Sequence, residues 1–532
     1  MHLLLIGVGI VLLTGGGSLH AQSDVETQST ANVQSLTSDN DVAGEQGEDQ
    51  VRIDDGWEVR YDNDRGPQIR TRPLRLHLRD VDTPALQYRL FPDESQRVPG
   101  NAAIFYLKAM GFLEQQPAAA AVMEKQKQWV SDAREKGESE FKPSIWLSMD
   151  PAKIDLAEAN EYLQLHSFQP RDLREAARRS TFDMDRRISE VPDPIGYLLP
   201  EIQYMRSMAR VQSLRCRVAI AEGRVQDAME VIQQQLALAS HLGQEPFLIS
   251  NLVGIAIGSI ALNDSIYLME HSESPNLYWA YATLPQPLVS TRAAAAYERN
   301  LLYHQLKLLR DVDATPRSVG YWNGFLDQIA TQFGYFAEEI GIASQDPKTV
   351  RQMLPGFVIA SYPGAKRYLI EREKMSAAEV DALPTTQVVF LALVRYYDYA
   401  SDEAFKYWNM PIWQTKLVPG IRDEFRVSDD EKRYGPMTKF ADLLLPAVKA
   451  ARLACARSQQ HIAMLQTVEA IRIYATQHDG QLPSSLDKLT VPPGIDPYTG
   501  RPMQYKKTGD SALLTGHPNR GLQRRFRLTV AK

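Results

Sequence analysis

The sequence predicts a mainly α protein of irregular antiparallel helical hairpins that ends in a small α+β element. Apolar residues recur at helical spacing between positions 101 and 479, and Pro or Gly separates one helical segment from the next. Strand-like alternation is confined to the two ends of the folded body, near Leu74 and after position 496. The chain has 532 residues, of which 44% are hydrophobic, and this is enough for a sizeable core.

The first 21 residues are typical of a secretory signal. Leu3 to Leu13 is an unbroken run of aliphatic residues and glycine, which is too short to cross a membrane and suits the hydrophobic region of a signal peptide. The pattern fits cleavage after Ala21, but both a cleaved and an uncleaved signal stay open. A buried N-terminal helix is the alternative. We therefore expect an exported protein that is periplasmic or associated with the cell envelope.

Residues 22–55 are expected to be a disordered acidic linker. They include nine Asp or Glu residues and a single base, Arg52, and a segment with so few apolar residues cannot offset the entropy of ordering. The whole chain has a formal net charge of −6, so the body that follows the linker is nearly neutral. This balance argues against nucleic-acid binding, which needs a basic surplus.

The first helical unit is placed at 56–288. It opens with strand-like alternation at Leu74, Leu76 and Leu78. The helical spacing then predicts helices over 101–116, 118–136, 154–165, 170–188, 200–222, 225–242 and 245–269.

One pair of these helices has the pattern of a tetratricopeptide unit. In the segment AEGRVQDAMEVI, Ala221 to Ile232, Gly223 ends one helix and Ala228 lets the next helix pack closely. Because no second copy follows at a period of about 34 residues, an irregular helical-hairpin domain is favoured over a repeat array.

The stretch from Pro246 to Leu262 is the most apolar part of the body. It spans about 17 residues and contains polar side chains, whereas a membrane span needs roughly 20 apolar residues. We therefore expect a core helix here and no integral membrane span apart from the signal segment. A membrane helix is the alternative.

The second unit, 289–445, contains an aromatic-rich segment at 390–413. Eight of these 24 positions are aromatic, against 9% of the whole chain. Packing of a helical core is the favoured explanation, and a groove for a sugar or a peptide is the alternative. The candidate ligand-binding residues are Tyr396, Tyr399, Trp408 and Trp413.

The chain has two cysteines, Cys216 and Cys455. Both lie in helical stretches among aliphatic and basic residues, where a cysteine is usually a small buried hydrophobic residue. Export would permit a disulfide between them, and both possibilities stay open at this point.

A search for catalytic patterns identifies no catalytic residue. The sequence has no phosphate-binding loop, no dinucleotide fingerprint, no His-Glu-x-x-His and no Gly-x-Ser-x-Gly. The histidines outside the signal are scattered, and no two of them are three or four positions apart, as metal ligation on a helix would favour. No metal ligand and no cofactor are therefore predicted.

The last unit, 446–532, begins with the longest helical candidate, which runs from Pro446 to His478. Two short strands are expected at 503–506 and 512–515. The final residues, 520–532, include five bases and no acid, and we expect a solvated basic terminus there.

The C-terminal unit resembles a known family. The segments EAIRIYATQHDGQLPSSLDKL (Glu469 to Leu489) and DPYTGRPMQY (Asp496 to Tyr505) are similar to the globular part of the major pseudopilins of type II secretion. The likeness covers about 37 residues. It lies in the order of a long helix, a turn with Gly and Pro, a short helix and a strand that begins with Asp-Pro. The resemblance implies an accessory role in a type II secretion-like system.

A broader resemblance involves most of the body. LRCRVAIAEGR (Leu214 to Arg224), PNLYWAYATLPQP (Pro275 to Pro287) and the C-terminal segment, in this order, resemble a group of uncharacterised bacterial secreted helical proteins. This resemblance implies a fold and a location, and it transfers no functional residue.

Three functional hypotheses follow. The leading one is a non-enzymatic exported scaffold or interaction protein that binds an envelope protein or a cell-wall component. The rival is a glycan-acting enzyme on a helical fold, with the aromatic segment 390–413 as its substrate platform. The third is the accessory role in a type II secretion-like system.

Overall fold

The computed structural model describes most of the chain after position 51. The described residues are 52–61, 68–79, 81–111, 142–191, 199–336, 345–418, 427–445, 447–519 and 521–531, with single positions between 124 and 135 and at 194 and 197. The predicted signal at 1–21, residues 22–51 of the acidic segment and most of the predicted helix 118–136 lie outside these ranges. Residues 52–55, expected to belong to the linker, form strand β1 (Arg52–Asp54) and the start of a turn.

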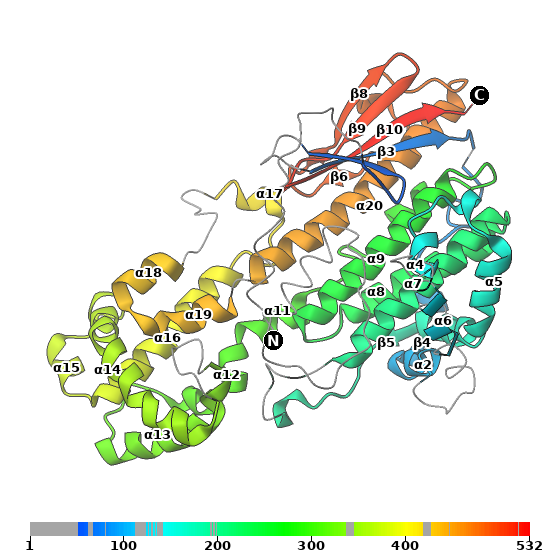
Figure 1. Cartoon of the computed structure of the whole chain (residues 1–532). Coiled ribbons are helices and arrows are strands. Elements are labelled where there is room, and N and C mark those ends of the chain that lie inside the picture. The colour runs from blue at the N-terminus through cyan, green and yellow to red at the C-terminus, as the bar shows by residue number, and fades with distance from the viewer. Residues whose placement is uncertain are drawn as a thin grey trace.

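The protein is mainly helical and has two lobes (Figure 1). The hydrophobic core of the first lobe draws on residues from Trp57 to Ala294 and again from Ala451 to Leu528. The core of the second lobe is built entirely from the chain between Ala295 and Leu445. The second lobe is therefore an insertion into the first, and segments 56–288 and 446–532 share one core.

Three long helices form the centre of the first lobe: α7 (Pro200–Ala221), α8 (Val225–Leu242) and α9 (Leu248–Met269). Pro200 opens α7, where its missing N–H costs no helical hydrogen bond. Gly223 has a φ of +74° and makes the tight turn into α8. These helices confirm the predictions for 200–222 and 225–242, and α9 starts three residues later than expected.

Smaller elements flank these helices: α2 (Ala103–Ala109), α4 (Lys142–Trp146), α5 (Leu156–Leu165), α6 (Gln169–Ala177), α10 (Tyr278–Ala282), β4 (Val98–Asn101) and β5 (Arg179–Thr181). The predicted helix 170–188 is wrong in its second half. There the chain leaves the helix after Ala177 because Arg179 and Thr181 pair with β4. Local periodicity cannot predict this strand pairing, because the partner strand lies about 80 residues away in the sequence.

Helix α9 has the length and apolar composition of a membrane span, the only such helix among the described residues. In the structure 78% of its candidate window is buried, against α7, α8 and the long helix α20 (Ala447–Gln477). Its Gly254 lies against α8, where an added Cβ would come within 2.8 Å of the carbonyl oxygen of Ala239. The small-residue spacing therefore serves close helix packing inside the lobe.

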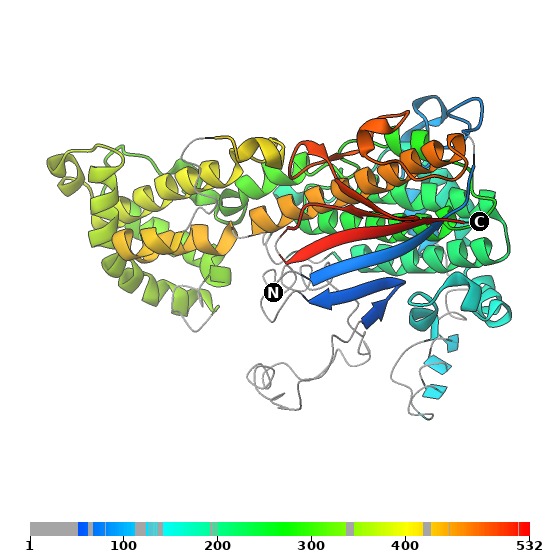
Figure 2. The same cartoon turned by 90° about the horizontal axis from the view of Figure 1, so that it is seen from above.

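A six-stranded sheet brings together the two ends of the described chain (Figure 2). Its order is β1-β2-β3-β10-β9-β8, and β3 and β10 are parallel while the other neighbours are antiparallel. The further strands are β2 (Trp57–Tyr61), β3 (Gln68–Leu76), β8 (Gln504–Thr508), β9 (Ser511–Thr515) and β10 (Leu522–Val530). The sheet packs on α20, where the Trp57 ring lies 6.4 Å from that of His461.

Strand β10 corrects the expectation of a solvated basic terminus at 520–532. Phe526 and Leu528 are buried while Arg527 and Thr529 between and after them are exposed. This alternation has the period of two that belongs to a strand with one covered face. The five bases dominate the composition of the segment, so composition alone does not reveal this alternation of buried and exposed residues.

The second lobe consists of helices around an aromatic core. Its elements are α11 (Arg292–Arg299), α12 (Leu301–Gln305), α13 (Val319–Phe333), α14 (Pro347–Glu371), α15 (Ala377–Asp381), α16 (Thr385–Phe405), α18 (Val427–Tyr434) and α19 (Lys439–Leu444). Helix α16 lies at the centre, and α17 (Ile412–Thr415) follows it near the junction of the lobes. The last helix of the first lobe, α20, confirms the long helix predicted at 446–478.

Candidate functional site

A groove of about 490 Å³ lies at the junction of the two lobes. Its floor is one face of α20, formed by Arg452, Cys455, Ala456, Gln459, Ile462, Ala463 and Gln466. They form two adjoining rows, 452-456-459-463-466 and 455-459-462-466, in which positions are three or four residues apart, so their side chains share one face of the helix. At 1.5 Å per residue the floor is about 21 Å long.

The walls of the groove come from three separate parts of the chain. One wall is the connection between α10 and α11, from Pro285 to Arg292. The other is the turn between α16 and α17, from Trp408 to Trp413, together with the loop from Pro493 to Pro497. Neither lobe forms this groove alone, because its walls belong to both.

The two tryptophans of the groove are held in place by their neighbours. The indole nitrogen of Trp408 donates a hydrogen bond to Thr291 Oγ1 at 3.2 Å, across from one wall to the other. The ring of Trp413 lies against Gly500, where an added Cβ would come within 2.7 Å of it. Gly500 also has a φ of +67°, a conformation that favours glycine. The groove therefore has rigid aromatic walls.

The other two candidate aromatics do not line the groove. Tyr396 is buried in the second lobe, where its hydroxyl donates to Asp430 Oδ2 at 3.2 Å. Tyr399 lies at the surface of α16 with 37% of its area exposed, and the Arg372 guanidinium lies 5.3 Å from its ring centre. The aromatic segment thus serves mainly the core of the second lobe, and only its last part reaches the groove.

The charged residues that line the groove are both arginines, Arg292 and Arg452. Arg452 Nη2 donates to the carbonyl oxygen of Met410 at 2.6 Å, while its Nε is buried with no hydrogen-bond partner. Burial lowers the pKa of this guanidinium, and no carboxylate of the described chain opposes the effect. This end of the groove therefore has positive charge without a counter-charge.

Three amide side chains at the groove, Gln286, Asn409 and Gln459, make no hydrogen bond with any other residue that the structure describes. A fourth amide, Gln466, contacts the hydroxyl of Tyr278. Each amide can both donate and accept a hydrogen bond. The groove therefore offers hydrogen-bonding capacity that the chain itself leaves unused.

The cysteines are far from bonding to each other, and both are free thiols. Cys216 is fully buried in α7, and its Sγ lies 3.6 Å from the carbonyl oxygen of Ala228. Cys455 lies on the groove floor, 4.0 Å from Thr291 Oγ1, and burial raises its pKa to about 11. At neutral pH it is a protonated thiol, which is a poor nucleophile. The structure therefore has two separate cysteines with no disulfide between them.

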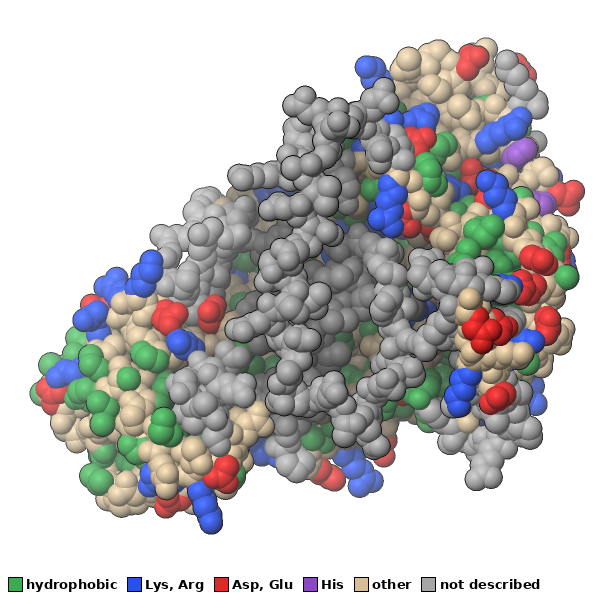
Figure 3. Space-filling model, in the orientation of Figure 1, with side chains coloured by type: hydrophobic (Ala, Val, Ile, Leu, Met, Phe, Trp, Pro, Cys, Tyr) green, Lys and Arg blue, Asp and Glu red, His purple; other side chains and the backbone are tan. Residues whose placement is uncertain are grey.

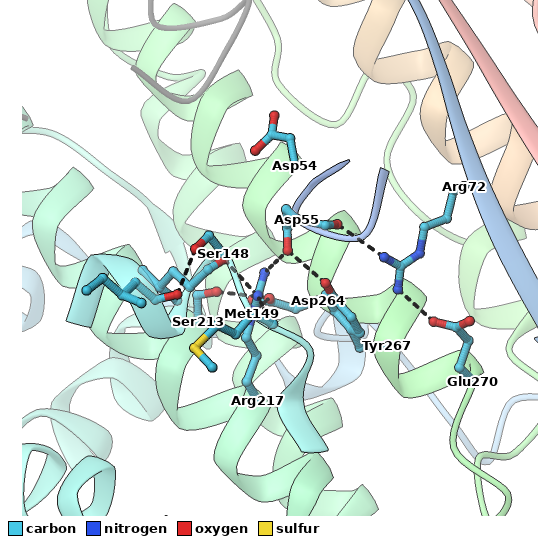
Figure 4. A network of polar contacts seen from close by, with 12 residues as sticks. Asp54, Asp55, Arg72, Ser148, Met149, Ser213, Arg217, Asp264, Tyr267 and Glu270 are labelled. Atoms are coloured by element: carbon cyan, nitrogen blue, oxygen red, sulfur yellow. Dashed lines mark hydrogen bonds and ion pairs between the residues drawn. The ribbon is translucent and has the colours of Figure 1, made fainter. Parts of the chain in front are cut away.

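A second cluster of charged residues lies inside the first lobe (Figure 4). At its centre is Arg217 of α7, whose Nε donates to Asp264 Oδ1 at 3.0 Å and whose Nη2 donates to Asp55 Oδ1 at 2.9 Å. Its Nη1 donates to the carbonyl oxygens of Leu147 and Met149 at 2.8 and 3.1 Å. Every nitrogen of this guanidinium has a partner.

The cluster continues to the sheet through Arg72. Its Nη2 donates to Glu270 Oε2 at 2.7 Å and its Nη1 to the carbonyl oxygen of Asp55 at 3.1 Å. The hydroxyl of Tyr267 donates to Asp55 Oδ1 at 2.9 Å. The hydrogen bonds and ion pairs of the cluster thus connect the turn after β1 to α7 and α9.

The electrostatics of this cluster are those of a buried ion-pair network. Burial raises the pKa of Asp264 to about 6, although Arg217 and Ser213 favour its charged form. Burial disfavours the charge of Arg217, but Asp55 and Asp264 outweigh it and raise the pKa of Arg217. Because its charged groups bind one another, we assign the cluster to stability. No group of three His, Cys, Asp or Glu residues in the described ranges could hold a metal ion.

Basic and acidic side chains are interspersed over the described parts of the face in Figure 3. This face therefore agrees with the nearly neutral body expected from the sequence.

The two arginines and the amides of the groove were not among the candidate residues predicted from the sequence. The apolar stripe of α20 that includes Ile462, Leu465 and Val468 packs in the core of the first lobe. The adjoining face that begins at Arg452 has the same helical spacing with polar residues between small ones. A second stripe of small and polar residues on a long helix is the sequence pattern that could have indicated a groove.

Comparison with protein-family models, curated proteins and solved structures finds no match for this chain. The resemblances to pseudopilins and to secreted helical proteins therefore stay predictions.

Proposed function

We propose that this protein is a non-enzymatic scaffold or interaction protein of the bacterial cell envelope, and that it binds a partner in the groove between its lobes. One observation supports this most: two fixed tryptophans and two arginines without counter-charge line the same groove. Rigid aromatic side chains and arginines are the residue types that dominate binding energy at protein interfaces. The envelope location depends on the signal-like segment 1–21.

The groove favours binding over glycan hydrolysis. Hydrolysis of a glycosidic bond uses two carboxyl groups that face each other about 5 to 10 Å apart. Neither Asp nor Glu occurs among the described residues that line the groove. In addition, Phe390, Tyr396, Tyr397 and Phe405 of the aromatic segment are buried in the second lobe. A glycan-acting enzyme that uses this segment is therefore the weaker proposal.

Site-specific photo-crosslinking tests the proposal. A photoreactive amino acid replaces Asn409 in the groove, where the native side chain makes no hydrogen bond with a described residue. The matched control carries it at Gln352, an exposed position of α14 in the second lobe. We expect a light-dependent adduct with an envelope component from position 409 alone. Equal adducts from both positions, or none from either, would contradict the proposal.

An accessory role in a type II secretion-like system is the second candidate. The observation that favours it is the order of α20, a short turn of helix at Leu486–Lys488 and the antiparallel strands β8, β9 and β10. Co-purification with the tagged secretion machinery would support this role, and its absence under cross-linking would count against it.

A further inference from the structure

We infer that the groove binds an extended peptide segment of a partner protein and places a carboxylate of that peptide at Arg292 and Arg452. This inference depends on the proposed binding function and names the chemistry of the partner.

The dimensions of the groove fit an extended chain. A floor of about 21 Å accommodates about six residues of a strand at 3.3 Å per residue. An extended peptide of about this length therefore matches the length of the floor.

The free amides of the groove favour a peptide over a lipid chain. An extended peptide has backbone N–H and C=O groups that need partners when they are buried. Gln286, Asn409 and Gln459 can supply both donors and acceptors along the groove, since none of them is used within the described chain. An acyl chain would cover these amides without satisfying them, which costs free energy.

The walls between the amides suit apolar side chains of such a peptide. Trp408 and Trp413 are fixed, and Pro411 lies between them on the same wall. Grooves with aromatic walls are used to recognise extended and proline-rich peptides. Because these walls are rigid before binding, little entropy is lost when a peptide packs against them.

The arginines supply charge complementarity for an acidic peptide. Arg452 is oriented by its hydrogen bond to the Met410 carbonyl, and its buried Nε still lacks an acceptor. Arg292 lines the same groove and makes no ion pair with a described residue. A carboxylate can accept two parallel hydrogen bonds from one guanidinium. The carboxylate can belong to Asp, Glu or the C-terminus of the partner.

The test is enrichment of a random pool of N-acetylated hexapeptides on the immobilised full-length protein. One pool ends in a free carboxylate and the other in an amide, and bound peptides are identified by mass spectrometry. We expect about tenfold enrichment of peptides that contain Asp, Glu or a free C-terminus, which corresponds to about 1.4 kcal/mol. The variants Arg292→Gln and Arg452→Gln should each reduce this enrichment, and the double variant should abolish it.

The control variant is Arg171→Gln, which removes a charge from the surface of α6. Its side chain is 82% exposed. It should leave the enrichment unchanged. Equal enrichment of acidic and neutral peptides, or enrichment that survives in the double variant, would overturn the inference. Circular dichroism and thermal unfolding of each variant verify that the fold is intact, and Arg292→Gln removes no side-chain hydrogen bond or ion pair with a described residue.

Failure of this inference is distinguishable from failure of the proposed function. If no peptide is retained while the crosslinker at position 409 still captures an envelope component, the peptide assignment is wrong and the binding function stands. If neither experiment detects a partner, both proposals are wrong.

Discussion

Arg217 in the first lobe and Arg452 in the groove differ in the partners of their guanidinium groups. In the first lobe, Arg217 has a partner for each of its nitrogens, including two carboxylates. In the groove, Arg452 has one carbonyl partner and a buried Nε that is unsatisfied. A buried charge that is fully paired holds elements together, whereas one that lacks a counter-charge is ready for a ligand. This contrast separates the structural cluster from the candidate site.

The largest effect is expected from Arg217→Met. The substitution leaves Asp55 and Asp264 without their cation, and breaking a buried pair in this way costs about 3–5 kcal/mol. Urea unfolding monitored by circular dichroism measures the change. The double variant Arg217→Met with Asp264→Leu should recover part of the loss, because an unpaired buried carboxylate is then removed. A loss below about 1 kcal/mol in the single variant would show that the cluster is not structural.

Glu298 of α11, a carboxyl group of intermediate exposure, tests the comparison through the pH dependence of stability. Its Oε1 accepts a hydrogen bond from the Leu248 backbone N–H at 3.4 Å, and burial raises its pKa to about 7. Because the folded state then binds this proton more tightly than the unfolded state, stability should fall as pH rises from about 4.5 through 7. Glu298→Gln keeps the acceptor and removes the charge.

The measurement for Glu298 is the difference in unfolding free energy between the variant and the native protein at pH 5, 6, 7 and 8. We expect the variant to gain relative stability over this range, by up to about 2 kcal/mol at pH 8. A difference that does not vary with pH would show that the carboxyl group is ionised in both states.

Gly500→Ala should disturb the groove with a moderate effect on stability. An alanine at a φ of +67° costs about 1–2 kcal/mol, and its Cβ would push against the Trp413 ring. We expect a shift in tryptophan fluorescence together with weaker peptide retention. The matched control is Gly509→Ala, which has a φ of +60° and no atom within 4 Å of the added Cβ. Equal fluorescence in both variants would argue against a fixed Trp413.

The smallest effect on stability is expected from Arg452→Met, within about 1 kcal/mol of the native protein. The substitution removes a guanidinium that has no counter-charge, so the lost hydrogen bond to Met410 is offset by relief of desolvation. Thermal unfolding measures the change, and retention of acidic peptides should be lost at the same time. A loss of 3 kcal/mol or more would place Arg452 in the same class as Arg217.

Local sequence patterns predicted the helices well where the apolar residues that recur at helical spacing are also the residues that pack in the core. Helices α8 and α20 match their predicted ranges because each has an uninterrupted helical spacing and a clear end at glycine. The patterns failed where a distant partner decides the structure. The segment after Ala177 becomes β5, and the basic segment after Arg520 becomes β10, since each pairs with a strand far away in the sequence.

The candidate site was predicted only in part for the same reason. Trp408 and Trp413 stood out through their aromatic neighbours, but so did Tyr396, which is buried in the second lobe. In the sequence, Arg292 and Arg452 resemble ordinary surface arginines. The local sequence does not show whether a carboxylate will pair with an arginine in the folded protein.

The sequence by itself determined the helical content, the long helix α20 and the acidic character of the segment before the body, because composition and periodicity are local properties. Only the tertiary structure decided that the two ends of the chain share one sheet and that the second lobe is an insertion. It also decided which buried arginine has partners. These features depend on contacts between residues hundreds of positions apart, where the pairing of charges and strands is set by the packing of the whole chain.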